Sequence, residues 1–393
     1  MGPILGQVSD SGHELDVGNP TVLVVHLVDP ARVLPKADDF VVGFIPAGES
    51  GKLWPGEVGE RAEVDAVHIK RGEPQYDHAR HHDSAYEDED VRSVWSESIT
   101  SSVVDYEYQN GRRYCGYRRG AYPLPNDEEE QDRLDLLHHI FRLALHGSLV
   151  SAPIGPTPQR VLDVGTGTGI WAMEFSDEFP SAQVIGTDIS PIQPSWVPPN
   201  TKFYIDDAES EWVYRPDEAF DYIHCRGMGG SIKDWDKLCA QCYTHVKPGG
   251  WVEFQEPEAW FRSDDNTKDR VPFVNQWQTL CNDAAKQFGK EIDLAPTHKQ
   301  RMIDAGFVDV REQIVKIPLG PWTKDPHFKE LGWYQLLHAT LGIEPYALAF
   351  ICNILGWSED ECRVLVAKTL EELRNRQNHL YVRFYFLSGS RPP

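Results

Sequence analysis

The stretch that most constrains the fold is Arg160–Trp171, which reads R-V-L-D-V-G-T-G-T-G-I-W. Its first five residues form a short apolar run, as in a strand buried on both faces. Three glycines then alternate with two threonines, and a helix-compatible stretch, Ile170–Phe179, follows. A strand that enters a helix through such a turn needs residues without Cβ, because the backbone turns tightly and lies against a ligand. The unpaired amides at the start of the helix can then donate hydrogen bonds to that ligand.

Two classes of cofactor bind at glycine-rich turns of this kind. The dinucleotide fingerprint G-x-G-x-x-G requires a small residue where this chain has Ile170. The spacing here is instead D-x-G-x-G-x-G, with Asp163 two residues before the first glycine. This spacing resembles motif I of the class I methyltransferases, whose methyl donor is S-adenosylmethionine (SAM).

Further apolar runs follow the glycine turn, and acidic residues close two of them. Asp188 ends the first run, about where both nucleotide-binding folds place a carboxylate for ribose hydroxyls. Asp206 and Asp207 close the second run. The alternation of strands and helices predicts a doubly wound α/β sheet. After Arg160–Val164, the predicted strands are Gln183–Asp188, Phe203–Ala208, Phe220–Cys225, Val252–Gln255, Phe307–Ile317 and Leu380–Ser388.

Helical patterns precede the glycine turn and fill the second half of the chain. The segment 320–378 is about sixty residues long and has predicted breaks near Gly342 and Gly356. We expect this insertion to overhang the methyl donor as a substrate lid; added packing is the simpler alternative. The other predicted helices are Leu124–Leu149, with Asn126 as its cap, Lys233–Val246, Val271–Phe288 and Pro296–Ala305.

Charge and composition exclude several classes of function. The formal net charge of the 393 residues is -23, which disfavours a nucleic-acid partner because such a surface repels phosphates. No apolar run approaches the ~20 residues that a membrane helix needs. The seven cysteines lack the spacing of a disulfide framework, which predicts reduced thiols. We therefore expect a protein of the cytoplasm, with the nucleus as the alternative.

The chain is predicted to have two parts. Residues 1–104 read as a poorly ordered acidic extension, and 105–393 as the methyltransferase domain. His78, His81 and His82 have a spacing that could hold a metal, but no further ligand cluster is evident. Cys239 and Cys242 lack the second pair of a structural zinc site and are expected to pack on one helix face. No metal site is predicted.

Several sequence strings make the resemblance more specific. They are Y-E-Y-Q-N-G-R-R-Y, L-P-N-D-E-E-E-Q-D-R-L-D-L-L-H-H, the glycine turn itself, I-G-T-D-I-S-P-I-Q-P-S-W-V-P-P-N and G-S-I-K-D-W. From about Val103 to Pro393 the chain is similar to the LaeA-like fungal methyltransferases. That group includes a nuclear regulator of secondary metabolism and tailoring enzymes of biosynthetic clusters. This chain departs from the family pattern at Cys115, where we expect His, and at Gly227, where Tyr is common.

The resemblance implies a class I, Rossmann-like fold of about seven strands, the last antiparallel, with helical additions at both ends. It places Asp207 beside the adenine. Tyrosines of 106–122 could contact the sulfonium and arginines there could hold the methionine carboxylate, although a purely structural loop is an equal alternative. The candidate cofactor-binding residues are Tyr114, Asp163, Gly165, Thr166, Gly167, Gly169, Asp188, Ile189, Asp207 and Ala208.

Ligands bind beyond the carboxyl ends of the strands, so the catalytic candidates are sought there. His224 and Glu256 lie at the ends of the predicted fourth and fifth strands and are candidate proton acceptors, although an isolated His is more often structural. No Asp/Asn-Pro-Pro-aromatic motif, which marks many nitrogen methyltransferases, follows the fourth strand. The sequence therefore predicts a SAM-dependent methyltransferase that acts on a small molecule in fungal secondary metabolism. The alternative is a LaeA-like regulator that acts through protein partners.

Overall fold

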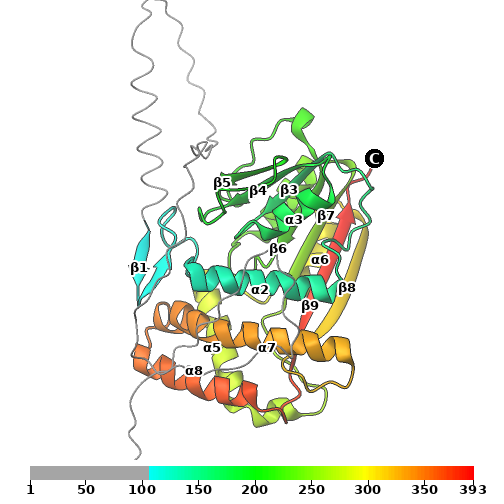
Figure 1. Ribbon diagram of the computed structural model, residues 1–393. Coiled ribbons are helices and arrows are strands. Elements are labelled where there is room, and N and C mark those ends of the chain that lie inside the picture. The colour runs from blue at the N-terminus through cyan, green and yellow to red at the C-terminus, as the bar shows by residue number, and fades with distance from the viewer. Residues whose placement is uncertain (1–105) are drawn as a thin grey trace, which may run out of the picture. The chain divides into compact units, whose positions relative to one another are not determined.

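The structure is a computed structural model that describes residues 106–393 (Figure 1). The predicted acidic extension, 1–104, and its three histidines lie outside the described residues. Within the described part, no helix is long and apolar enough to cross a membrane.

A seven-stranded mixed sheet organises these residues, in the order β5-β4-β3-β6-β7-β9-β8. The first five strands along the chain are parallel, whereas β9 pairs antiparallel with both β7 and β8. The doubly wound fold with an antiparallel last strand is therefore confirmed. The strands are β3 (Arg160–Val164), β4 (Gln183–Asp188), β5 (Thr201–Ile205), β6 (Phe220–Arg226), β7 (Val246–Pro257), β8 (Val308–Pro318) and β9 (Tyr381–Ser390).

Helices cover both faces of the sheet. On one face, α3 (Ile170–Glu178) buries Trp171 and Phe175 against β3, β4 and β6. On the other face, α4 (Trp235–His245) and α6 (His298–Asp304) pack against β6 and β7. Short helical turns lie at η2 (Pro216–Glu218), η3 (Thr267–Arg270) and η4 (Ala295–Thr297). A separate hairpin, β1 (Glu107–Gln109) and β2 (Arg112–Tyr114), turns through Asn110 and Gly111, both with positive φ.

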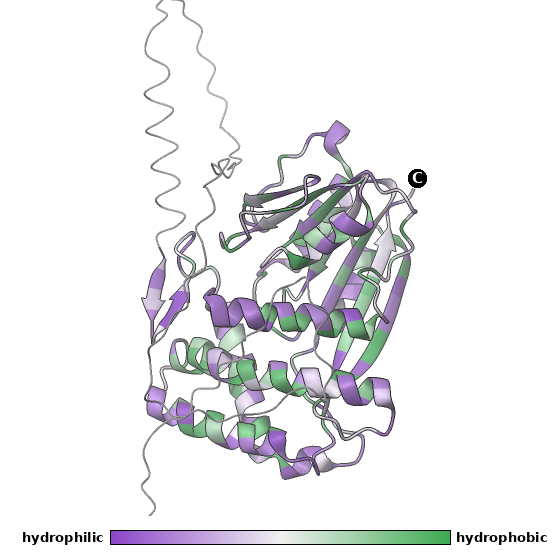
Figure 2. Cartoon of the chain, viewed as in Figure 1, coloured by the Kyte–Doolittle hydropathy of each residue, from purple (hydrophilic) through white to green (hydrophobic). Residues whose placement is uncertain are grey.

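Four longer helices form a layer of their own beside the sheet (Figure 1). They are α2 (Glu128–Ala144), α5 (Pro272–Phe288), α7 (Pro326–Tyr346), which continues as the π-helical η5 (Ala347–Cys352), and α8 (Glu359–Arg374). Figure 2 shows α2 and α8 alternating between hydrophobic and hydrophilic residues, as helices with one buried face do. Phe141 of α2 joins this layer to β9, with its ring centroid 4.7 Å from that of Phe384.

Two local predictions about these helices are wrong. The cap of α2 is Asp127, whose carboxylate accepts the Glu130 N–H, and not Asn126. The predicted break at Gly342 is absent, because α7 runs through that residue to Tyr346. An added Cβ at Gly342 would lie 3.7 Å from Cδ of Arg133, so the glycine sits where α7 closely approaches α2. The predicted break at Gly356 is present, and its φ is +78°.

The cysteines are mostly buried thiols, as expected, with one exception. Cys352 of η5 and Cys362 of α8 bring their sulfur atoms close enough to form a disulfide. Cys239 and Cys242 are free and fully buried on α4, where they pack as small apolar side chains. No group of His, Cys, Asp or Glu within 106–393 is arranged to hold a metal ion.

Candidate functional site

The glycine turn adopts a backbone that side chains would obstruct. Gly165, Gly167 and Gly169 have φ of +68°, +57° and +82°. A Cβ at Gly165 would lie 2.1 Å from Sδ of Met228, and one at Gly169 would lie 2.4 Å from the Phe203 ring. A Cβ at Gly167 would meet only Leu134, at 3.8 Å. The Phe203 ring thus leaves no room for a side chain at Gly169, the flexible end of Met228 fills the space at Gly165, and Gly167 faces open space.

Asp188 fixes the turn from the carboxyl end of β4. The Gly167 N–H donates to its Oδ2 over 2.8 Å, and the Ser190 N–H donates to its Oδ1 over 2.8 Å. Burial raises the pKa of Asp188 above its ordinary value. Each carboxylate oxygen accepts one backbone hydrogen bond and retains capacity for another. The carboxylate is thus placed to accept two neighbouring hydroxyl groups.

A cavity of about 120 Å³ opens beside this carboxylate. We call it the cofactor cavity. Six of the ten predicted cofactor residues line it: Gly165, Gly167, Asp188, Ile189, Asp207 and Ala208. Tyr122 of the 106–122 stretch also lines it, as do Asn126 and Lys290, for which the sequence predicted no role in cofactor binding.

The other four predicted cofactor residues lie outside this lining. Asp163 is buried beneath the turn, where its Oδ2 accepts the Thr166 hydroxyl over 2.6 Å. Gly169 caps α3 and lies against Phe203. Tyr114 is buried at the end of β2. Asp163, Thr166 and Gly169 thus shape the turn from behind.

His224 is also outside both the cofactor cavity and the second cavity described below. It is completely buried, stacks on Trp171 with ring centroids 3.8 Å apart, and its Nδ1 lies 2.7 Å from Oδ1 of Asp163. A ring enclosed in this way does not reach an acceptor molecule. Its position corrects the expectation that it faces the methyl group: the structure gives it the role of holding Asp163 under the glycine turn.

The segment 106–122 crosses the carboxyl ends of β4 and β5. The Cys115 thiol donates to the carbonyl of Ile189 over 3.1 Å, and the Tyr106 hydroxyl donates to the carbonyl of Pro191 over 3.4 Å. Its four arginines all pair with carboxylates of the chain, namely Arg112 with Asp127, Arg113 with Glu128, Arg118 with Asp207 and Arg119 with Glu107. These pairs favour the structural-loop alternative for the arginines.

Two polar groups of the cofactor cavity have unused capacity. Nδ2 of Asn126 is buried and has no hydrogen-bond partner, although the residue lines the cavity. Arg226 is partly buried beside Phe141 and contacts His138, and it forms no ion pair within the described residues. Burial lowers the pKa of Arg226 to about 10, so it remains charged at neutral pH. Asn126 was expected to be a cap; because Asp127 takes that role and Oδ1 of Asn126 accepts a hydrogen bond from Nε of Arg113, its Nδ2 is left for the cavity.

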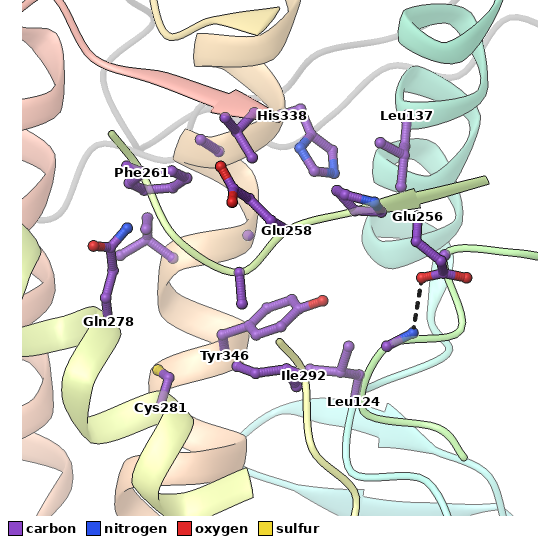
Figure 3. Close-up of a pocket in the computed structure, with 18 of the residues that line it drawn as sticks. Leu124, Leu137, Glu256, Glu258, Phe261, Gln278, Cys281, Ile292, His338 and Tyr346 are labelled. Carbon is purple, nitrogen blue, oxygen red and sulfur yellow. Dashed lines mark hydrogen bonds between the residues drawn. The ribbon is translucent and has the colours of Figure 1, made fainter. Parts of the chain in front are cut away.

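A second cavity, of about 150 Å³, lies between the sheet and the helical layer (Figure 3). We call it the acceptor cavity. Residues of α2, α5, α7, β7 and β9 line it, so the predicted insertion does supply one wall. Four residues line both cavities: Tyr122, Leu134, Gly227 and Ser231. An added Cβ at Gly227 would meet no atom within 4 Å, so this residue leaves the junction open.

Glu256 is the predicted catalytic residue that does reach the acceptor cavity. Its carboxylate is 1% exposed and accepts the Met228 N–H over 2.8 Å and the Gly229 N–H over 3.2 Å (Figure 3). Burial raises the pKa of Glu256 to about 8, although both amides oppose the shift. A carboxyl with a pKa near neutrality beside a cavity is suited to exchange a proton with a bound molecule.

Comparison with known proteins identifies the family. Residues 136–310 match the model of a methyltransferase domain. Methyltransferase pytC of Aspergillus terreus is 42% identical over 296 residues, which are 75% of this chain and 91% of pytC. The chain belongs to the LaeA-like fungal methyltransferases. Secondary metabolism regulator LAE1 of Cochliobolus heterostrophus is 37% identical, over 72% of this chain and 94% of LAE1.

A third relative is named as a methyltransferase that acts on a protein. Protein-methionine methyltransferase laeA of Emericella nidulans is 37% identical, over 75% of this chain and 79% of the relative. The cofactor of this methyltransferase family is SAM. The cavity fits it, because the glycines leave room at the turn, the Asp188 carboxylate lines the cavity and Asn126 Nδ2 lacks a partner within the described residues.

Proposed function

We propose that this LaeA-like methyltransferase transfers the methyl group of SAM to a small-molecule acceptor in fungal secondary metabolism. The observation that carries the proposal is the junction of the two cavities at Tyr122, Leu134, Gly227 and Ser231. A donor in one cavity and an acceptor in the other would meet there without crossing bulk water. The net charge of -23 disfavours nucleic acid as the acceptor.

The chain contributes chiefly position to this reaction. SAM supplies a methyl group activated by a sulfonium. Asp188 orients the ribose, and Arg226 and Asn126 hold the charged amino-acid end in our proposal. Such alignment accounts for roughly 7–11 kcal/mol in well-oriented reactions. The Glu256 carboxylate accepts the proton that a hydroxyl acceptor loses as its oxygen bonds to the methyl carbon.

One observation favours a second candidate function, methylation of a protein methionine. Met228 lines the cofactor cavity, and its Sδ lies against the glycine turn, 2.1 Å from the place that a Cβ at Gly165 would take. A thioether sulfur that attacks the same methyl carbon would become a sulfonium while the bond from that carbon to the donor sulfur breaks, and no proton would be released. The relative named as a protein-methionine methyltransferase makes this candidate concrete. A regulator of this kind would act through protein partners, in the cytoplasm or nucleus.

Incubation with labelled SAM and an extract of the producing fungus tests the proposal. We expect label in an extractable small molecule and none with Gly167→Trp, whose side chain would enter the cofactor cavity. Gly155→Trp is the matched control, because Gly155 is exposed and an added Cβ there meets no atom within 4 Å. Label on Met228 of the protein, absent in Met228→Leu, would instead support the second candidate.

A further inference from the structure

The acceptor cavity contains buried polar groups that have no hydrogen-bond partner among residues 106–393. Gln278 of α5 is completely buried, and neither its side-chain oxygen nor its nitrogen has a partner. Oε1 of Gln335 on α7 is also unpartnered, and the residue is 4% exposed. Buried amides without partners are uncommon, because each forfeits its hydrogen bonds to water. Both residues line the cavity, so a bound molecule can supply the missing bonds.

His338 adds a third group of the same kind. Its Nε2 lies 2.5 Å from a guanidinium nitrogen of Arg133 and therefore accepts that hydrogen bond. The proton of the neutral ring then resides on Nδ1, which is buried and unpartnered. Burial, aided by the charge of Arg133, lowers the pKa of His338 well below its ordinary value, so the ring stays neutral. His338 of α7 thus presents one neutral N–H donor to the cavity.

The charged side chains that line the acceptor cavity already have partners within the chain. Arg133 pairs with Glu130 one turn earlier on α2, at 2.5 Å. Both carboxylate oxygens of Glu258 lie 2.9 Å from Nε of Arg262. Glu256 accepts two backbone amides and is kept largely protonated near neutral pH by its burial. A charged acceptor would find no free counter-charge among the described lining residues, while it would lose its hydration.

Apolar and aromatic side chains make up most of the remaining wall. In Figure 3 the Tyr346 ring crosses the middle of the cavity, with Gln278 on one side and Glu256 on the other. Flat rings stack well on such walls. The other apolar lining residues include Leu124, Leu137, Phe261, Trp277, Ile292 and Phe384.

We propose that the acceptor is an uncharged ring compound that carries a hydroxyl and, at its opposite end, a carbonyl that accepts a hydrogen bond from Gln278. The proposal rests on the proposed function and names its substrate class. Gln278 determines specificity and does not touch the reacting atoms, which lie at the junction beside Glu256. In the absence of the acceptor, the Gln278 amide remains buried and unsatisfied, so it destabilises the free protein.

The unsatisfied amide of Gln278 should lower the thermal stability of the free protein, which a glutamine with a purely structural role would not do. Gln278→Leu replaces the unpartnered amide with an apolar side chain of similar size, so we expect the melting temperature of the free protein to rise by about 2 °C. Gln276→Leu is the matched control on the same helix, because Gln276 is exposed. We expect the control to leave the melting temperature unchanged. A fall in the melting temperature of Gln278→Leu would overturn the proposal.

Four matched probes test the acceptor class by calorimetry on protein saturated with S-adenosylhomocysteine. They are 3-hydroxyacetophenone, 3-methylphenol, 3-hydroxybenzoate and 3-hydroxybenzylamine, which share a hydroxylated ring and differ in one substituent. We expect the ketone to bind most tightly. We also expect Gln278→Leu to weaken the ketone about three- to tenfold and leave 3-methylphenol unchanged, since one neutral hydrogen bond is lost.

Tighter binding of the benzoate or the amine, equal weakening of both neutral probes, or no binding of the ketone would overturn the proposal. These outcomes differ from a failure of the proposed function. If labelled SAM marks an extractable small molecule while Gln278→Leu behaves like its control, the function stands and the assignment of Gln278 fails. If no small molecule is labelled, the function itself fails.

Discussion

Asp188 organises the donor site because two backbone amides converge on one buried carboxylate. The Gly167 and Ser190 amides hold it at 2.8 Å each, so a ribose would meet a fixed acceptor. Removing a hydrogen bond to a charged group costs roughly 1.5–3 kcal/mol. We therefore predict that Asp188→Ala weakens SAM binding about ten- to a hundredfold in calorimetry.

The control for this variant is Asp177→Ala, because Asp177 is exposed on α3. It removes a carboxylate of the same size and should leave the dissociation constant for SAM unchanged. Circular dichroism should show that both variants are folded. Equal SAM affinity in Asp188→Ala and the parent would remove Asp188 from the donor site.

Glu256 should make methyl transfer depend on pH. Its pKa is raised to about 8 by burial, and only the ionised carboxylate accepts a proton. We predict that the rate rises with pH through about 8 and that Glu256→Gln lowers this rate and flattens its pH profile. The affinity for SAM should stay unchanged, because Glu256 lines the acceptor cavity alone. An unaltered profile in Glu256→Gln would assign the proton to another group.

The same pKa shift fixes the sign of a stability effect. The native carboxyl binds its proton more tightly than the unfolded one, whose pKa is near the ordinary 4.5. Between pH 4.5 and about 8 the native state therefore holds more protons, and the stability from this group falls as pH rises. Unfolding in urea should show that Glu256→Gln loses less stability over this range than the parent does.

At the scale of elements, α7 contains two glycines with opposite roles. An added Cβ at Gly332 would lie 2.3 Å from the carbonyl oxygen of Gly320, which is backbone and cannot move aside. At Gly342 the nearest atom, Cδ of Arg133, would be at 3.7 Å, an ordinary contact. We predict that Gly332→Ala destabilises the protein by roughly 1–3 kcal/mol. In Gly342→Ala, the better helix propensity should add up to ~1 kcal/mol.

Urea unfolding of the two variants side by side measures this difference. Both substitutions replace glycine with alanine on the same helix. Any effect that alanine has on helix stability in general is therefore removed when the two free energies of unfolding are compared. If Gly332→Ala is as stable as Gly342→Ala, the close approach of α7 to the segment around Gly320 is not a constraint on this fold.

Elements were easier to predict than the contacts among them. The limits of β4 follow from Q-V-I-G-T-D, because a buried strand and a closing acid are local features of the sequence. The continuation of α7 through Gly342 could not be read in this way, because it depends on the packing of α7 against α2, about two hundred residues away in the chain. Local propensity misleads where tertiary packing holds a glycine inside a helix.

In the donor site and the acceptor cavity, too, local motifs could be predicted from the sequence and contacts between distant segments could not. The glycine turn and Asp188 are contiguous motifs, and their placement follows from parallel strands ending at one edge of the sheet. Gln278 and Gln335 carry no motif, because two separate helices must dock before their amides share a cavity. His224 could not be excluded from the sequence either, because its burial depends on Trp171 of another element.

At the scale of the whole molecule, both cavities are built from residues 121–384. The described chain contacts the edge of the sheet from its first residue, Tyr106, whose hydroxyl donates to the carbonyl of Pro191. We therefore predict that a truncated protein beginning at Ser101 binds SAM as tightly as the full chain and melts at the same temperature. Residues 1–100 are then dispensable for donor binding, whatever partner they contact.

A second truncation, beginning at Pro123, sharpens this test. It removes Tyr122, which lines both cavities, and the Arg118–Asp207 ion pair over the cofactor cavity. Because this shorter protein lacks one wall of the donor site, its SAM affinity in calorimetry should fall, whereas the protein beginning at Ser101 keeps the parental value. If both truncations bind SAM equally well, the segment 106–122 is not part of the donor site. If the protein beginning at Ser101 is insoluble, the catalytic domain begins before residue 101.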